Sequence, residues 1–390
     1  MTKKNIRKIL FNIISILNVL VPKNKKKIFF YDSTFRKDNL WALCKHMSEN
    51  NYDDNYELIY FTKKKLDVDK DTSIYGVKFV SNSIVGLYHH LTSKNIFTAF
   101  GAYGFMSKSY NRQNVINLWH GSPLKSIGQL VSANPWYNYN SVFSFTVCGS
   151  DFFKQIFQEC FGFTSEKGIV FGAPRNDFLF AENNNLEKLQ VDKKMYKKII
   201  LWMPTFRVSK ENKYYDSSNE FPLIKEDNIE YLNEVLKSNK VLLIIKPHPF
   251  QEDISVLNRE ISNVLVLRNQ QLNIKKIELY ELLGEVDVLL TDYSSVYFDF
   301  LLTQKPIGFV LDDIHEYRDK RGFVVENPLE LMPGEKIYNE EEFVGFIKNT
   351  CNGIDNYKDE RKRINDLANK YQDNKNCERI LDFLGIALEK

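Results

Sequence analysis

The sequence predicts an α/β protein made of two domains, each a parallel sheet wrapped by helices. Its 390 residues are more than one hydrophobic core usually serves, so two domains with a cleft between them are expected. From Lys26 onward, short β-rich runs alternate with helical patterns, which is typical of parallel sheets. The polar stretch 181–198, rich in Asn and Lys, interrupts this alternation and is predicted to join the two domains.

The first domain is expected over residues 28–190, because this range holds a complete series of strand and helix patterns. Its strands are predicted at Ile28–Tyr31, Leu58–Phe61, Asn95–Phe100, Val115–Trp119, Phe143–Cys148 and Gly168–Phe171. The residues Gly149-Ser150-Asp151 are typical of a helix N-cap and predict a helix over 152–160.

The second domain is expected over residues 191–390 and repeats the same alternation. Its strands are predicted at Ile199–Met203, Val241–Lys246, Val264–Leu267, Val286–Thr291 and Ile307–Leu311. The charged tail, residues 340–390, has a helical pattern in which Phe343, Phe346 and Ile347 form a face that we expect to be buried.

Residues 1–27 differ from the rest of the chain in charge, because they hold eight Lys or Arg and no Asp or Glu. Within them, residues 9–21 are apolar except for Asn12, Ser15 and Asn18, whose spacing predicts one polar stripe on an amphipathic helix. Such a helix rises about 20 Å, too little for the ~30 Å hydrocarbon core, so we interpret it as an interfacial anchor on an anionic membrane. A helix packed on the core and a secretory signal are the alternatives, although no small-residue cleavage site follows.

Charge and cysteine usage argue against several classes of protein. The excess positive charge lies in one terminal segment, so a nucleic-acid-binding surface is not expected. The five cysteines are scattered without CxxC spacing, which favours a reducing cytosol. No DxD motif or His/carboxylate cluster is evident, and the pair Asp312-Asp313 is interpreted as a solvated loop. Neither a metal ion nor another cofactor is therefore expected.

The residues that directly follow the predicted strands carry the chemistry, since ligands of open α/β sheets bind beyond the carboxyl ends of the strands. Four such segments stand out. They are His120-Gly121-Ser122-Pro123-Leu124-Lys125, Pro204-Thr205-Phe206-Arg207, Lys246-Pro247-His248-Pro249 and Thr291-Asp292-Tyr293-Ser294-Ser295.

Two histidines lie in loops that the sequence predicts to be rigid. Gly121 lets the backbone approach a ligand beside His120, and Pro123 stiffens the same loop, both useful for positioning a base. His248 is held between two prolines after a buried strand. A single loop histidine is often only structural, but two that are held in this way predict a catalytic pair.

The run Asp292-Tyr293-Ser294-Ser295 predicts an anion site. It places hydroxyls and backbone N–H groups at the start of a predicted helix, where the helix dipole favours a pyrophosphate. The alternative is an ordinary N-cap, since Ser and Asp are the usual capping residues. Arg175, Arg207 and Lys246 end other loops and would neutralise phosphate charge if they converge.

Five motifs, taken in order, resemble the signatures of the CDP-glycerol glycerophosphotransferase family of teichoic-acid synthesis. They are NLWHGSPLKSIG, GAPRND, MPTFR, KPHP and LLTDYSSVYFDFLLTQKPIGFVLDDIHEYRDKRGF. The resemblance runs from about Asn114 to Phe323 and is looser outside these bounds.

The resemblance implies a GT-B-like fold, in which two Rossmann-like domains face each other across a cleft and the second domain holds most of the donor. It also implies a peripheral enzyme on the cytoplasmic face of the membrane, and essential roles for His120 and His248. The remaining residues expected to bind the CDP-activated substrate are Trp119, Gly121, Ser122, Pro123, Arg175, Thr205, Phe206, Arg207, Lys246, Pro247, Asp292, Ser294, Ser295 and Asp299.

We therefore expect transfer of a polyol phosphate from CDP-glycerol or CDP-ribitol to a lipid-linked or saccharide acceptor, in teichoic acid or capsule synthesis. His120 would deprotonate the acceptor hydroxyl, which attacks the distal phosphorus and releases CMP, while His248, Ser294 and Ser295 stabilise the pyrophosphate charge. The alternatives are a GT-B glycosyltransferase that uses a nucleotide sugar, and a non-catalytic subunit of a polymer-assembly complex.

Overall fold

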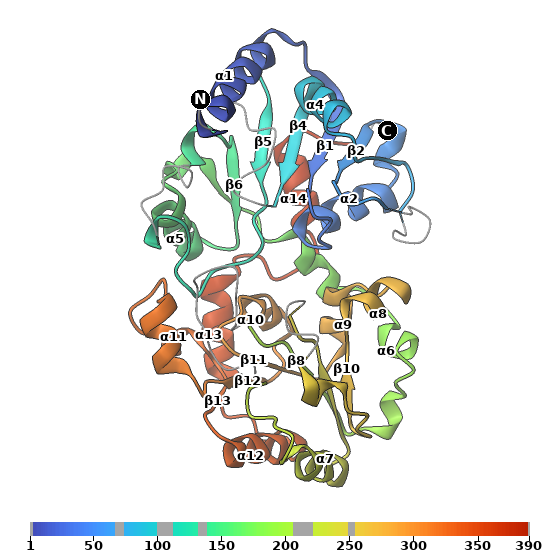
Figure 1. Ribbon diagram of the computed structural model, residues 1–390, viewed down its shortest axis with the longest axis vertical. Coiled ribbons are helices and arrows are strands. Elements are labelled where there is room, and N and C mark those ends of the chain that lie inside the picture. Colours follow the sequence, from blue (N-terminus) through green and yellow to red (C-terminus); the bar gives the residue numbers. More distant parts are fainter. Residues whose placement is uncertain are drawn as a thin grey trace. The chain divides into compact units, whose positions relative to one another are not determined.

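The computed structural model describes residues 3–66, 74–99, 112–131, 139–205, 221–248 and 254–388, and it divides the chain into two compact units (Figure 1). Unit 1 comprises Met1–Gly121, Gly128–Asp177 and Lys370–Lys390, and unit 2 comprises Ser122–Ile127 and Phe178–Asn369. Each unit is built on one parallel sheet with helices packed on it. The predicted α/β class with two parallel sheets is therefore confirmed.

The sheet of unit 1 has the strand order β3-β2-β1-β4-β5-β6-β7, with every described pair parallel. Its strands are β1 (Asn24–Tyr31), β2 (Glu57–Phe61), β3 (Val77–Val80), β4 (Ser93–Thr98), β5 (Asn114–Asn117), β6 (Phe145–Cys148) and β7 (Gly168–Val170). The central strands β1, β2 and β4 hold apolar residues on both faces of the sheet because both faces are covered, and Phe29, Ile59 and Ile96 are fully buried. The prediction missed β3, an edge strand whose mixture of exposed and buried residues gives little apolar signal.

Three helices in the described part of unit 1 begin at an N-cap residue whose side chain accepts backbone N–H groups. The described helices of this unit are α1 (Lys3–Leu20), α2 (Asn39–Glu49), α4 (Ser83–Thr92), α5 (Asp151–Phe161) and α14 (Asn376–Phe383). Asp38, Asn82 and Ser150 accept backbone N–H groups at the starts of α2, α4 and α5, as the Gly149-Ser150-Asp151 motif predicts for α5. Gly162 ends α5 in the left-handed conformation that glycine adopts without strain.

The sheet of unit 2 has the order β10-β9-β8-β11-β12-β13 and is also parallel. Its strands are β8 (Lys198–Trp202), β9 (Val241–Ile245), β10 (Val264–Val266), β11 (Val288–Thr291), β12 (Ile307–Val310) and β13 (Glu335–Ile337). The short β13 was not predicted, because Glu335 and Lys336 leave it only one strongly apolar residue. In both sheets the direction of strand addition reverses beside the first strand, between β1 and β4 and between β8 and β11, which is the usual place for a ligand.

Helices cover the sheet of unit 2 and bury its core. They are α6 (Asn185–Lys188), α7 (Ile229–Ser238), α8 (Asn269–Ile274), α9 (Leu279–Glu285), α10 (Val296–Phe300), α11 (Ile314–Arg321), α12 (Glu340–Cys351) and α13 (Lys358–Ala368). Phe343, Phe346 and Ile347 of α12 are buried in this core, as predicted from the helical pattern of the tail.

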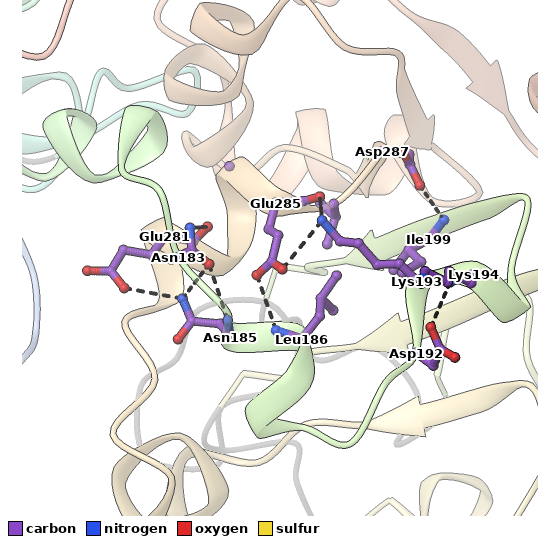
Figure 2. A network of polar contacts seen from close by, with 12 residues as sticks. Asn183, Asn185, Leu186, Asp192, Lys193, Lys194, Ile199, Glu281, Glu285 and Asp287 are labelled. Atoms are coloured by element: carbon purple, nitrogen blue, oxygen red, sulfur yellow. Dashed lines mark hydrogen bonds and ion pairs between the residues drawn. The ribbon is translucent and has the colours of Figure 1, made fainter.

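The polar stretch 181–198 does not join the units but is packed within unit 2 (Figure 2). The amide of Asn183 donates to the carbonyl of Glu281 (3.1 Å), and the carboxylate of Glu285 accepts from the backbone N–H of Leu186 (3.1 Å). Glu285 also pairs with Lys193 at 3.4 Å. These polar side chains therefore dock the stretch on α9, whereas the sequence pattern predicted a connection between the two domains.

The boundaries between the two units differ from the predicted boundary at 190/191. The chain leaves unit 1 after Asp177, and residues 370–390 return to it. The carboxylate of Asp177 accepts the backbone N–H groups of Asn376 (3.0 Å) and Cys377 (2.9 Å), and so caps the start of α14. This contact joins positions 199 and 200 residues apart, so it leaves no local signal in the sequence.

Candidate functional site

In unit 1, the chain turns sharply between the end of β5 and His120. Trp119 has φ +52° in the left-handed region, which is costly for a residue with a side chain, and Gly121 has φ +121°, which only glycine adopts readily. The side-chain oxygen of Asn117 accepts the N–H of Trp119 (3.0 Å), and the indole ring lies 4.6 Å from the ring of Phe161. The turn is thus held by contacts on both sides, as the predicted rigid loop requires.

His120 is only partly exposed as a residue, and its ring nitrogen Nδ1 is engaged. Nδ1 lies 3.2 Å from the carbonyl oxygen of Ala99, which can only accept, so Nδ1 carries the proton and Nε2 is the basic nitrogen. Burial lowers the pKa of His120 from its ordinary 6.5, opposed by the charge of Asp38 and the bond to Ala99 and assisted by Arg175 and Arg36. The ring is therefore neutral near pH 7, the state that a general base needs.

The turn before His120 is also held by Asn39, a residue that sequence reasoning missed. Its side chain is fully buried and its amide nitrogen donates to the carbonyls of Leu118 (3.2 Å) and Trp119 (2.8 Å). Its amide oxygen accepts the backbone N–H of Arg175 (3.1 Å). Asn39 thereby ties the loop after β5 to the GAPRND motif. The sequence signal for Asn39 is its position directly after Asp38, the N-cap residue of α2, in the segment that follows β1.

Arg175 is buried in unit 1 and paired with a carboxylate. Its Nη1 lies 2.7 Å from Oδ1 of Asp38, the residue that caps α2. Asp38, Arg175 and His120 are close enough that both charges act on the pKa of the imidazole. Unit 1 thus brings His120, Trp119, Gly121 and Arg175 together from two predicted motifs.

Unit 2 has its polar cluster where strand addition reverses, at the carboxyl ends of β8 and β11. The carboxylate of Asp292 accepts the backbone N–H of Thr205 (2.7 Å) and also the Thr205 hydroxyl. The hydroxyl of Thr291 donates to the carbonyl of Met203 (2.7 Å). Both Thr205 and Asp292 are buried, so these bonds fix the two loop starts relative to each other. Phe206 and Arg207, predicted on the same loop, lie outside the described residues.

The KPHP motif follows β9, the neighbour of β8. The ammonium of Lys246 is buried and donates to the carbonyl of Pro247 (2.9 Å), while the backbone N–H of Lys246 bonds to the carbonyl of Trp202 (2.8 Å). His248 comes next and is partly exposed. A buried strand thus ends in a lysine that is bonded to the next residue and is followed by a partly exposed histidine.

The DYSS motif opens α10, which has only five residues before it continues as a 3₁₀ turn. Ser294 and Ser295 are partly exposed, and the Ser295 side chain makes no capping bond to α10. Asp299 is buried and accepts the hydroxyl of Tyr280 (2.7 Å). In this structure Asp299 therefore braces α10 against α9, while the two serines keep accessible hydroxyls.

Ser122 and Pro123 belong to unit 2, although they directly follow the glycine of the unit 1 loop. The segment Ser122–Ile127 pairs with residues 322–324, through bonds that include Val324 N–H to the carbonyl of Leu124 (2.9 Å). The motif that looked like one loop in the sequence is therefore divided between the two units.

Among the described residues, no group of three or more His, Cys, Asp or Glu side chains is placed to hold a metal ion. Of the acidic pair after β12, Asp312 is exposed, whereas Asp313 accepts the hydroxyl of Tyr293 (2.8 Å). The interpretation as a solvated loop therefore fits Asp312 but not Asp313. The bond from Tyr293, which also stacks on Tyr317, supplies the physical reason.

Two Rossmann-like parallel sheets, with polar loops at the carboxyl ends of their strands, give the chain a GT-B-like fold. Residues 13–385 match the CDP-Glycerol:Poly(glycerophosphate) glycerophosphotransferase family, and the chain belongs to this family. The family resemblance of the five motifs is confirmed.

Individual relatives agree with the family. The chain is 30% identical over 249 residues to the teichoic acid glycerol-phosphate primase of Bacillus subtilis, covering 63% of this chain and 58% of that protein. It is 28% identical over 366 residues to the teichoic acid poly(glycerol phosphate) polymerase of Bacillus spizizenii, covering 88% and 87%. The structure is similar to that of the wall teichoic acid polymerase TagF, with a TM-score of 0.75, 20% identity and coverage of 98% and 93%.

Proposed function

We propose that the chain transfers a polyol phosphate from CDP-glycerol or CDP-ribitol to an acceptor hydroxyl, with release of CMP, in teichoic acid or capsule synthesis. The observation that carries this proposal is the environment of His120, whose Nδ1 is engaged by Ala99 so that Nε2 is the basic nitrogen. Membership of the glycerophosphotransferase family supplies the reaction class. Relatives named as glycerol-phosphate and as ribitol-phosphate polymerases support the two donors.

In the proposed reaction, Nε2 of His120 takes the proton of the acceptor hydroxyl. The acceptor oxygen forms a bond to the distal phosphorus of the donor, and the bond from that phosphorus to the bridging oxygen breaks, so that CMP leaves with the electron pair. His248, Ser294 and Ser295 stabilise the negative charge that develops on the phosphates. The lowered pKa of His120 supports its role, because a base must be unprotonated before the reaction.

The donor is proposed to bind unit 2 at the end of β8 and β11. The buried bonds between Thr205 and Asp292 support this assignment, because they hold the two loop starts rigid where ligands of such sheets bind. Lys246 supplies a positive charge on the neighbouring strand end, and Arg207 belongs to the same proposed donor set.

The proposal is tested by measuring the release of CMP from CDP-glycerol and CDP-ribitol, each with a lipid-linked disaccharide, a polyol-phosphate chain and a capsular saccharide as acceptor. Mass measurement of the product then gives the number of units added. We expect CMP release that depends on acceptor with at least one donor. Release of UDP from a nucleotide sugar, without CMP release, would instead support the glycosyltransferase alternative.

We also propose that the chain acts as a peripheral protein on the cytoplasmic face of the membrane, where a lipid-linked acceptor would be found. No helix in the described part of the chain is long and apolar enough to span a bilayer. In α1, the polar residues Ser15 and Asn18 are buried against unit 1, whereas Ile13, Ile16 and Leu20 are exposed. The helix therefore turns its apolar side outward, which supports contact between this side and anionic lipid.

A further inference from the structure

The helix α4 of unit 1 also presents apolar side chains to the outside. Ile84 is 81% exposed and Tyr88 58% exposed, and the neighbouring Val85 is also exposed. The helix is held in this orientation from its other side, where His89 and His90 are buried and the ring of His90 packs against Phe29 at 6.0 Å. The outward apolar residues therefore contribute nothing to the core that would explain their presence.

Polar contacts connect α4 to α1, so the two exposed apolar faces belong to one part of unit 1. The ammonium of Lys23, which follows α1, donates to the carbonyl of Leu91 in α4 (2.5 Å) and to the side chain of Asn18 in α1 (2.6 Å). The amide of Gln113 accepts from Asn18 and donates to the carbonyl of His90, both at 2.7 Å. Figure 1 shows both helices at the same end of unit 1.

The charge of the surrounding sequence selects the kind of partner. Residues 1–31 hold eight Lys or Arg and residues 72–150, which include α4, hold five, and neither range contains an Asp or Glu. Lys27 lies over the ring of Tyr88 at 5.1 Å and pairs with Glu57 of β2 at 3.2 Å. An apolar face bordered by cations fits an anionic lipid surface, where each nearby Lys or Arg contributes roughly 1 kcal/mol.

We propose that α4 is a second lipid-binding helix, and that α1 and α4 together form one surface through which unit 1 lies on an anionic membrane. This inference rests on the proposed membrane association and adds to it a second element and an orientation. Ile84 and Tyr88 enter the interface between head groups and acyl chains, and the excess positive charge of the surrounding sequence attracts the lipid phosphates. Two helices share the binding, so neither has to supply the whole affinity.

The test is sedimentation of the full chain with vesicles of phosphatidylcholine, with and without phosphatidylglycerol. The double variant Ile84→Ser/Tyr88→Ser should lower the partition coefficient on phosphatidylglycerol vesicles about tenfold or more, because two large apolar side chains no longer enter the interface. The matched control is Tyr231→Ser/Ile274→Ser, which removes side chains that are 54% and 72% exposed on unit 2 and should bind like the wild type.

The outcomes separate this inference from the proposal on which it rests. If the wild type does not sediment with phosphatidylglycerol vesicles, membrane association itself is refuted, and α4 with it. If the wild type binds and the α4 variant binds equally well, only the role of α4 is refuted. Equal binding of the wild type to vesicles without phosphatidylglycerol contradicts the role assigned to the cations. CMP release with a soluble acceptor and the melting temperature of the α4 variant should match the wild type, which shows that a loss of binding is not a loss of fold.

Discussion

The two units share a strand order around their first strand but use the carboxyl edge of the sheet differently. Unit 1 places its histidine after β5, one strand beyond the reversal between β1 and β4, and holds it with buried neutral amides. Unit 2 places its polar residues at the reversal itself, where Asp292 binds Thr205 through a carboxylate. The buried bonds of unit 1 therefore orient one imidazole, whereas those of unit 2 hold a strand end rigid beside partly exposed side chains.

The largest expected effect distinguishes catalysis, proposed for unit 1, from donor binding, proposed for unit 2. His120→Asn should lower kcat by about 10²–10⁴-fold, because the positioned base is lost, while the Kd for CDP-glycerol remains close to that of the wild type. The rates come from CMP release and the Kd from calorimetry with donor alone. An unchanged melting temperature is the control for folding. A variant that keeps more than a tenth of the wild-type rate would show that His120 is not the base.

The second prediction concerns the hydrogen bonds between Asp292 and Thr205 in unit 2. Asp292→Asn removes the charged acceptor of the Thr205 backbone and hydroxyl, and a hydrogen bond to a charged group contributes about 1.5–3 kcal/mol. The Kd for the donor should therefore rise roughly tenfold to a hundredfold. Asp287→Asn is the matched control, because Asp287 accepts the backbone N–H of Ile199 (2.8 Å) at the start of β8. Equal effects of both substitutions on donor affinity would argue against a donor site at the end of β8.

The comparison also shows which features the sequence alone predicts. Most of the buried central strands contain a short apolar run, such as Val241–Ile245, so their positions and the histidines that follow them can be predicted from the sequence. The edge strands β3 and β13 are not, because their residues alternate in exposure or are charged. The role of Asn39 could not be predicted for a different reason. Its three hydrogen bonds reach residues 79, 80 and 136 positions away, so they form only when the chain folds.

The third prediction tests Asn39 as a positioning residue for His120. Asn39→Asp keeps an oxygen for the N–H of Arg175 but removes the donors to the carbonyls of Leu118 and Trp119. We expect kcat to fall about tenfold, which corresponds to roughly 1.4 kcal/mol, with the KM for donor unchanged. Asn233→Asp is the control, since the buried Asn233 also accepts a backbone N–H and donates through its amide, in unit 2. A lower melting temperature with an unchanged kcat would show that Asn39 stabilises the fold but does not position His120.

The smallest expected effect is a pair of opposite shifts in the pH dependence of unit 1. As a neutral base, His120 loses activity when the pH falls through its pKa, which burial lowers below 6.5. The charge of Asp38 raises this pKa, so Asp38→Asn should move the acid limb of kcat/KM to lower pH, while Asn still caps α2. The charge of Arg36 lowers the pKa, so Arg36→Gln should move the limb to higher pH, and by less at high salt because this side chain is exposed. Shifts in the same direction would mean that the acid limb reports a group other than His120.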